Sequence, residues 1–162
     1  MVEVFGIPII AGSKFKNSGK LNHAASIMAE LLDQDSDGCA DDPNVLKNIL
    51  IKKKGKYRQA MVLPNGSITK AQSNKALHKA LKEKGFRYGQ DLSFGEVLPK
   101  CSGLNFTTTC SDSSIEEQFH FITNFGHSRA YGQIFGTHWV DTSNLTKAMD
   151  IARYLFGLNF PY

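Results

Sequence analysis

The chain has 162 residues, a length that suits one domain with a sizeable hydrophobic core. Hydrophobic residues make up 41% of the chain and charged residues 21%, and these ordinary proportions exclude a wholly disordered protein. The formal net charge of +4 is too small to indicate a particular partner, and no apolar run is long enough to cross a membrane.

The N-terminal third of the chain predicts a strand followed by two helices. Residues 2–11 are rich in Val, Ile and Phe and end at a Gly-Ser pair, which predicts a buried strand. Apolar residues then recur at helical spacing on both sides of an acidic stretch, which predicts a helix pair over about 20–54. The first stripe comprises Ala24, Ile27, Met28, Leu31 and Leu32, and the second comprises Val45, Leu46, Ile49 and Leu50. Asp42 and Pro43 are typical of a helix cap and first helical position, so we expect the second helix to begin there.

The stretch between the two predicted helices has the composition of a calcium-binding loop. Residues 33–44 read Asp-Gln-Asp-Ser-Asp-Gly-Cys-Ala-Asp-Asp-Pro-Asn. Carboxylates at alternate positions can converge on a hard cation, and Gly38 permits the sharp turn that follows them. Without a cation, so many like charges would repel one another at close range. The expected ligands are Asp33, Asp35, Asp37 and the backbone carbonyl of Cys39.

This helix, acidic loop and helix together resemble an EF-hand. The loop is also similar to those of thrombospondin type 3 repeats and dockerins, which favour a carboxylate at the ninth position, where this chain has Asp41. The twelfth position normally carries Glu or Asp, and here it is Asn44. The resemblance therefore implies Asp41 and Asn44 as further calcium ligands. Because Asn44 has no carboxylate, it also implies weak binding in an extracellular, calcium-rich setting. The alternative is an acidic surface turn that binds no ion tightly.

The middle and C-terminal parts of the chain predict further helices and strands. A basic cluster after the second helix comprises Lys52, Lys53, Lys54, Lys56 and Arg58. A solvated helix end explains this cluster better than a nucleic-acid site, so we expect no nucleic-acid partner. In chain order, the expected elements are a strand at 57–63, a helix at 69–84, one or two strands within 86–98, an irregular loop at 99–112, a helix at 114–125 that stops at Gly126, a strand at 131–140 and a last helix whose apolar face spans 145–156. About five helices with scattered strands predict a single α+β domain over residues 1–162.

The helix expected at 114–125 carries a second candidate site. Its apolar stripe is predicted to be Ile115, Phe119 and Ile122. The sequence Glu-Glu-Gln-Phe-His at 116–120 is similar to the zincin signature His-Glu-x-x-His, with a carboxylate in place of the first histidine. This resemblance implies Glu116 and His120 as zinc ligands and Glu117 as the base that activates a metal-bound water. A third ligand could be His127, although it lies one residue beyond the spacing of the extended signature.

A purely structural explanation of that helix also stands. Ser113 or Ser114 with a glutamate three residues later forms a capping box, so the glutamates could cap the helix. His120 would then be a half-buried histidine that is bonded to a neighbouring residue.

Two features favour secretion. Asn65, Asn105 and Asn144 each begin an N-glycosylation acceptor triplet. Cys101 and Cys110 flank a segment rich in Gly, Asn and Thr and could form a disulfide, which would leave Cys39 unpaired. The alternative is three reduced thiols in a cytosolic protein. No signal peptide is recognisable at the N-terminus.

These patterns together predict a secreted calcium-binding protein in which Ca²⁺ joins two helices. The alternative function is a small hydrolase that holds Zn²⁺ with Glu116, His120 and His127 and uses Glu117 as its base. A toxin or matrix component that recognises a protein or mineral surface is a third alternative, for which the sequence names no residue.

Overall fold

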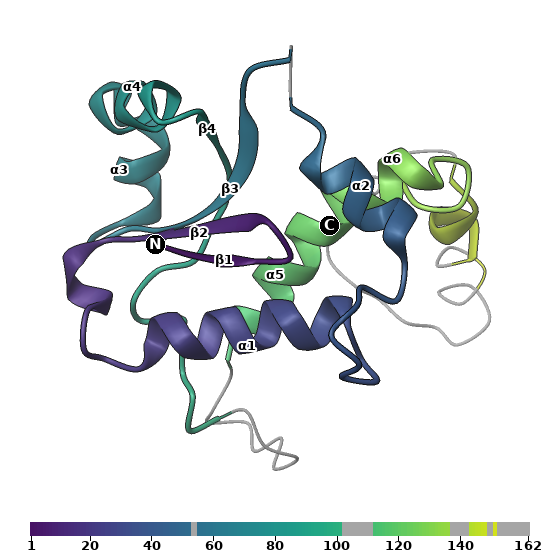
Figure 1. Ribbon diagram of the computed structural model, residues 1–162, viewed down its shortest axis with the longest axis horizontal. Helices are drawn as coiled ribbons and strands as arrows, with labels where there is room; N and C mark the ends of the chain where they lie inside the picture. Colours follow the sequence, from purple (N-terminus) through teal and green to yellow (C-terminus); the bar gives the residue numbers. More distant parts are fainter. Residues whose placement is uncertain (53–54, 102–111, 137–142, 149–150, 152–162) are drawn as a thin grey trace.

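A computed structural model describes residues 1–52, 55–101, 112–136, 143–148 and 151. Within residues 1–136, the described part forms six α-helices and a four-stranded sheet, so the predicted α+β class is confirmed (Figure 1). The strands are β1 (Val2–Val4), β2 (Ile7–Ala11), β3 (Arg58–Leu63) and β4 (Phe86–Asp91). The α-helices are α1 (Lys20–Leu32), α2 (Pro43–Leu50), α3 (Ile68–Ser73), α4 (Lys75–Glu83), α5 (Ser114–Ile122) and α6 (Ser128–Ala130). A short 3₁₀ turn, η1 (Ser13–Phe15), precedes α1, and a π-helix, η2 (Thr123–His127), joins α5 to α6.

The strands lie in chain order across the sheet. β1 and β2 pair antiparallel, whereas β2, β3 and β4 run parallel. The single strand expected over residues 2–11 is wrong, because the chain turns back at Phe5 and Gly6. Both residues have positive φ, at 48° and 81°, as in a tight two-residue hairpin turn. Glycine adopts this conformation without steric cost, which favours a turn at this point.

Each parallel pair of strands needs a crossover connection, and the two crossovers lie on opposite faces of the sheet. α1 and α2 connect β2 to β3 on one face, and α3 and α4 connect β3 to β4 on the other (Figure 1). Side chains alternate between the faces along β2 and β3. The first face contributes Ile7, Ile9, Met61 and Leu63 to the larger core, where α1, α2 and α5 pack. The second contributes Ile10, Ala60 and Val62 to a smaller core with Leu81 of α4.

Two of the expected helices have different limits in the structure. The helix expected at 69–84 is broken at Asn74, whose side-chain oxygen accepts a hydrogen bond from the backbone N–H of Leu77 at 3.0 Å and caps α4. The helix expected to stop at Gly126 instead continues through η2 and α6 to Ala130. Packing against α2 overrides the usual tendency of glycine to end a helix.

The predictions for the remaining elements are confirmed only in part. Residues 86–98 contain one strand, β4, and residues 144–148 are helical as expected for the last helix. The strand expected at 131–140 is wrong over 131–136, which form turns and irregular backbone. Residues 137–140, and the last helix beyond 148 except for residue 151, lie outside the described residues. Among the described helices, none has the length and apolar character needed to span a bilayer.

Candidate metal centre

The acidic loop lies between α1 and α2, as the sequence predicts. α1 ends at Leu32, and its carbonyl oxygen accepts a hydrogen bond from the backbone N–H of Asp41 at 2.8 Å, which closes the base of the loop. At the other end, Asp42 caps α2. One of its carboxylate oxygens accepts hydrogen bonds from the backbone N–H groups of Asn44 and Val45, at 2.9 and 3.0 Å. The loop is therefore fixed at both ends by the helices that flank it.

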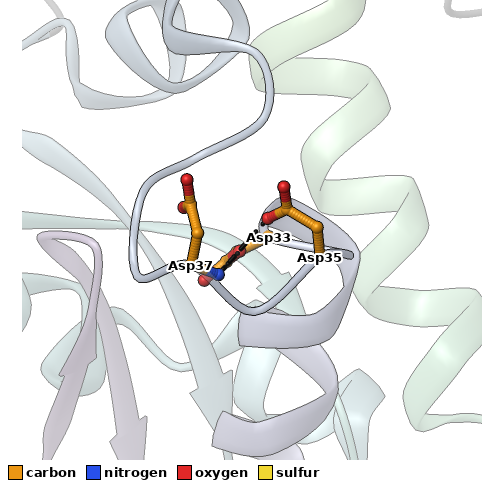
Figure 2. Close-up of side chains that lie close together, drawn as sticks. All are labelled: Asp33, Asp35 and Asp37. Carbon is orange, nitrogen blue, oxygen red and sulfur yellow. Dashed lines mark hydrogen bonds between the residues drawn. The ribbon is translucent and has the colours of Figure 1, made fainter.

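Three carboxylates converge within this loop. Asp33, Asp35 and Asp37 each place one oxygen within 4.8 Å of the others (Figure 2). Among the described His, Cys, Asp and Glu side chains, no other group of three or more is arranged in this way. Asp33 is only 9% exposed and lies at the end of α1, whereas Asp35 and Asp37 are exposed. One carboxylate of the group is therefore largely buried, and the other two face solvent.

Backbone hydrogen bonds hold these carboxylates in place. Asp33 accepts hydrogen bonds from the N–H groups of Asp37 and Gly38, at 3.1 and 3.0 Å. Asp37 in turn accepts one from the N–H of Cys39 at 2.7 Å. Ser36 and Gly38 have positive φ, at 59° and 87°, so the chain bends sharply around the carboxylates. The loop geometry therefore positions oxygens, the donor type that hard cations require.

The electrostatic field of the cluster acts on the neighbouring thiol. The negative charge of Asp37 is the main cause of a raised pKa at Cys39, and desolvation, a hydrogen bond to Asp37 and the charges of Asp33 and Asp35 act in the same direction. Cys39 is exposed and free, as expected. The acidic cluster therefore disfavours the thiolate form of Cys39.

Two further expected ligands make local hydrogen bonds, and Asp41 does not join the three-carboxylate group. Asp41 instead accepts a hydrogen bond from the backbone N–H of Gln34 at 2.9 Å. Asn44 lies in the first turn of α2, where its backbone carbonyl accepts a hydrogen bond from the side-chain amide of Asn48 at 2.9 Å. The structure thus brings Asp33, Asp35 and Asp37 together and gives the other two side chains local roles.

The second candidate site has only part of its expected arrangement. Glu117 lies on α5 with a carboxylate oxygen 3.7 Å from Nδ1 of His120, and it also accepts a hydrogen bond from the side-chain amide of Gln90. Glu116, His120 and His127 do not form a three-ligand group within the described part of the chain. Gln90 comes from β4, and no sequence pattern points to it.

The side chain of His127 lies among aromatic rings. Its ring centroid is 4.7 Å from that of Phe135 and 6.5 Å from that of Phe119. Burial lowers its pKa, and the negative charge of Asp42 partly opposes this effect. His127 therefore lies near both Asp42, at the end of the acidic loop, and Phe119 of α5.

A hydrogen bond that the sequence does not predict joins the same two regions. The Tyr131 hydroxyl donates to Asp42 at 2.8 Å. Burial alone would raise the pKa of Asp42, but hydrogen bonds from Val45, Tyr131 and Asn44, together with the nearby His127, lower it. Asp42 therefore stays ionised and connects α2 to the segment after α6.

Some of the cysteines and asparagines that favour secretion lie within the described residues, and others lie outside them. Cys101 is disulfide-bonded, and its expected partner Cys110 lies outside the described residues, as does Asn105. Asn65 is exposed, but its side-chain nitrogen donates to the Ser13 hydroxyl at 3.1 Å. Asn144 is exposed at the start of a helical segment.

Comparison with known proteins adds no relative. No protein-family model matches the chain, and neither a curated protein nor a solved structure matches it.

Proposed function

We propose that this chain is a secreted calcium-binding protein in which Ca²⁺ joins α1 to α2. The observation that carries this proposal is the convergence of Asp33, Asp35 and Asp37, whose oxygens lie within 4.8 Å of one another between two helices. Two unit charges at this separation repel by about 1 kcal/mol in water, and by more where the protein partly excludes water. A bound cation would turn this repulsion into attraction.

Calcium suits this loop better than the other common metal ions. The three carboxylates supply only oxygen, which disfavours zinc and copper, because those ions prefer imidazole or thiolate. The loop is exposed at Asp35 and Asp37, so water can complete a coordination shell of variable geometry. Ca²⁺ accepts such flexible shells, whereas Mg²⁺ needs near-ideal octahedral geometry.

The composition of the loop also suggests how tightly calcium binds. Asn44 takes the place of a bidentate carboxylate, and Asp41 is engaged with the backbone of Gln34. A loop with three converging carboxylates should bind with a Kd of roughly 10⁻⁴–10⁻³ M, the range of extracellular calcium modules. The disulfide at Cys101 supports the same location, because such bonds persist in oxidising compartments.

The first prediction concerns stability in calcium. About 10 mM calcium should stabilise the parent protein by about 1–3 kcal/mol if the Kd lies in the proposed range. Asp35→Ala should abolish most of this gain while leaving stability in EDTA unchanged or slightly higher, because it removes one ligand and one repelling charge. Thermal unfolding with and without calcium measures both effects, and isothermal titration calorimetry gives the Kd.

Glu30→Ala provides the matched control. Glu30 is an exposed carboxylate on α1 outside the converging group, so its loss changes the net charge by the same amount. The control should keep the full calcium response. If Asp35→Ala and the parent show equal calcium stabilisation, or if the parent shows none, the proposal fails.

The contact between Glu117 and His120 favours a second candidate function, a zinc-dependent hydrolase. In that function His120 would help to hold the metal, and Glu117 would accept a proton from a metal-bound water. Glu117→Gln should then lower hydrolysis of peptide substrates by about 10²-fold or more while leaving zinc content and melting temperature near parental values. Glu83→Gln, on the distant helix α4, is the control.

Metal analysis of the purified protein separates the two functions. Calcium without zinc, together with no hydrolysis, supports the calcium-binding protein alone. Stoichiometric zinc with activity that depends on Glu117 supports the hydrolase, and unchanged activity in Glu117→Gln removes it.

A further inference from the structure

An open groove lies on the side of the sheet opposite the acidic loop. Its volume is about 580 Å³, and it runs along α4 beside the residue that precedes β3. The residues that determine its chemistry are Tyr57, Gln72, Lys75, His78, Lys79 and Lys82. The groove is independent of both candidate sites described above.

Lysines dominate the lining of this groove. Lys75, Lys79 and Lys82 recur at positions i, i+4 and i+7, which places them along one side of α4 over about 10 Å. All three are exposed. Among the described lining residues, the one acidic side chain is Glu83, whose carboxylate lies 3.9 Å from the Lys79 ammonium group. Three lysines and one glutamate give the described lining residues a charge of +2 when His78 is neutral.

The wall of the groove is fixed before any ligand binds. His78 donates a hydrogen bond from Nε2 to the backbone carbonyl of Gln72 at 2.9 Å, across the break between α3 and α4. Its ring stacks on Tyr88 of β4, with centroids 5.1 Å apart and planes 7° apart. Asn74 caps α4 at the same corner. A groove held in this way needs little reorganisation to receive a ligand.

We propose that this groove binds a sulfated polysaccharide chain. Lysine ammonium groups act as point charges and suit successive sulfates on an extended polymer. Gln72, whose amide nitrogen donates to Asp91 at 2.8 Å, offers its amide oxygen to sugar hydroxyls, and Tyr57 supplies an aromatic ring in the lining. Nucleic acid is the less favoured polyanion, because single-stranded sites stack bases on several aromatic rings, and among the described lining residues Tyr57 is the only unstacked ring.

The choice of a sulfated glycan rests on the extracellular location put forward under the proposed function. The disulfide at Cys101 supports an oxidising compartment, where polyanions accessible to the protein include sulfated glycans. Binding through the groove does not depend on the calcium loop, so the two proposals can fail separately.

The experiment uses heparin as the probe and measures its affinity in about 0.15 M salt, where charges farther apart than about 8 Å are largely screened. The variant Lys75→Gln/Lys79→Gln/Lys82→Gln should bind heparin about 100-fold more weakly, since each lysine near a polyanionic surface contributes roughly fivefold. Its calcium affinity and melting temperature should match those of the parent. A steep loss of binding with rising salt should be shared by the parent and the control.

The control Lys14→Gln/Lys16→Gln/Lys47→Gln removes the same net charge from exposed positions outside the groove. It should bind heparin within about threefold of the parent. An equal loss in both triple variants would show a response to net charge alone and overturn the proposal. So would the absence of heparin binding at this salt concentration, or tighter binding to duplex DNA of matched charge.

Discussion

Single residues carry several of the long-range connections in this protein, and Asp112 is a clear example. Its side chain is only 2% exposed, and one carboxylate oxygen lies 2.6 Å from Nε2 of His23 on α1. The other accepts hydrogen bonds from the backbone N–H groups of Leu98 and Ser114, at 3.2 and 3.1 Å. One carboxylate therefore joins α1, the segment after β4 and the start of α5.

The pKa of Asp112 gives a prediction at this scale. Burial alone would raise this pKa, but the hydrogen bonds from Ser114, His23 and Leu98 lower it below the usual value for aspartate. The stabilisation is then present above about pH 4, where the carboxyl of an unfolded chain ionises, and is lost as the pH falls through the lower folded pKa. Asp112→Asn should cost about 1–3 kcal/mol of unfolding free energy at pH 7.

Urea unfolding of the parent and of Asp112→Asn at pH 7 and near pH 3 measures this dependence. The difference between the two proteins should shrink at the lower pH, because protonation removes the same charge from the parent. A difference that stays constant over this range would contradict an ionic role for Asp112.

At the scale of elements, close packing between α2 and η2 determines how the C-terminal half meets the acidic loop. Gly126 is buried in η2 against α2. A Cβ atom at this position would lie 2.6 Å from Cγ1 of Val45 and 3.1 Å from Cγ1 of Ile49. Only glycine fits this approach, and this explains why a residue that often ends helices lies inside a helical segment here.

Gly126→Ala should therefore destabilise the protein by about 1–3 kcal/mol, because the added methyl group overpacks the interface. In an exposed helix the same substitution would stabilise by up to about 1 kcal/mol. Thermal or urea unfolding measures the change. Combining it with Val45→Ala should cost less than the sum of the two single changes, since the smaller side chain makes room for the methyl group.

Gly95→Ala is the control for this prediction. A Cβ atom at Gly95 would have no heavy atom within 4 Å, so its effect should stay within about 0.5 kcal/mol. If Gly126→Ala proves as mild as Gly95→Ala, η2 does not pack against α2 as described.

On helix α5, the apolar pattern of the sequence does not identify the buried face correctly. The sequence predicts a buried stripe of Ile115, Phe119 and Ile122, yet Ile115 and Phe119 are each 48% exposed and only Ile122 is buried. The buried side instead carries Gln118 and Phe121, both fully buried, and neither polar atom of Gln118 has a hydrogen-bond partner among the described residues. Phe121 packs closely on Gly89 of β4, so the sheet selects the buried face of α5.

At the scale of the whole molecule, the two proposed binding sites lie on opposite faces of one sheet. The acidic loop joins α1 and α2, which cover the face with the larger core, whereas the basic groove lies along α4 on the other face (Figure 1). The net charge of +4 conceals this separation of an acidic region from a basic one. The two proposed ligands, calcium and a polyanion, would therefore not compete for the same side chains.

Elements with local signals could be predicted from the residues alone. The helix–loop–helix at 20–50 follows from apolar spacing and from the Asp42-Pro43 start signal, and the alternating aspartates of the loop suffice to bring three carboxylates together. The folded structure was needed to show which face of α5 is buried, why Gly126 continues a helix, and that Glu116, His120 and His127 form no three-ligand group among the described residues. These outcomes depend on contacts between segments distant in the chain, and a local pattern holds no information about such contacts.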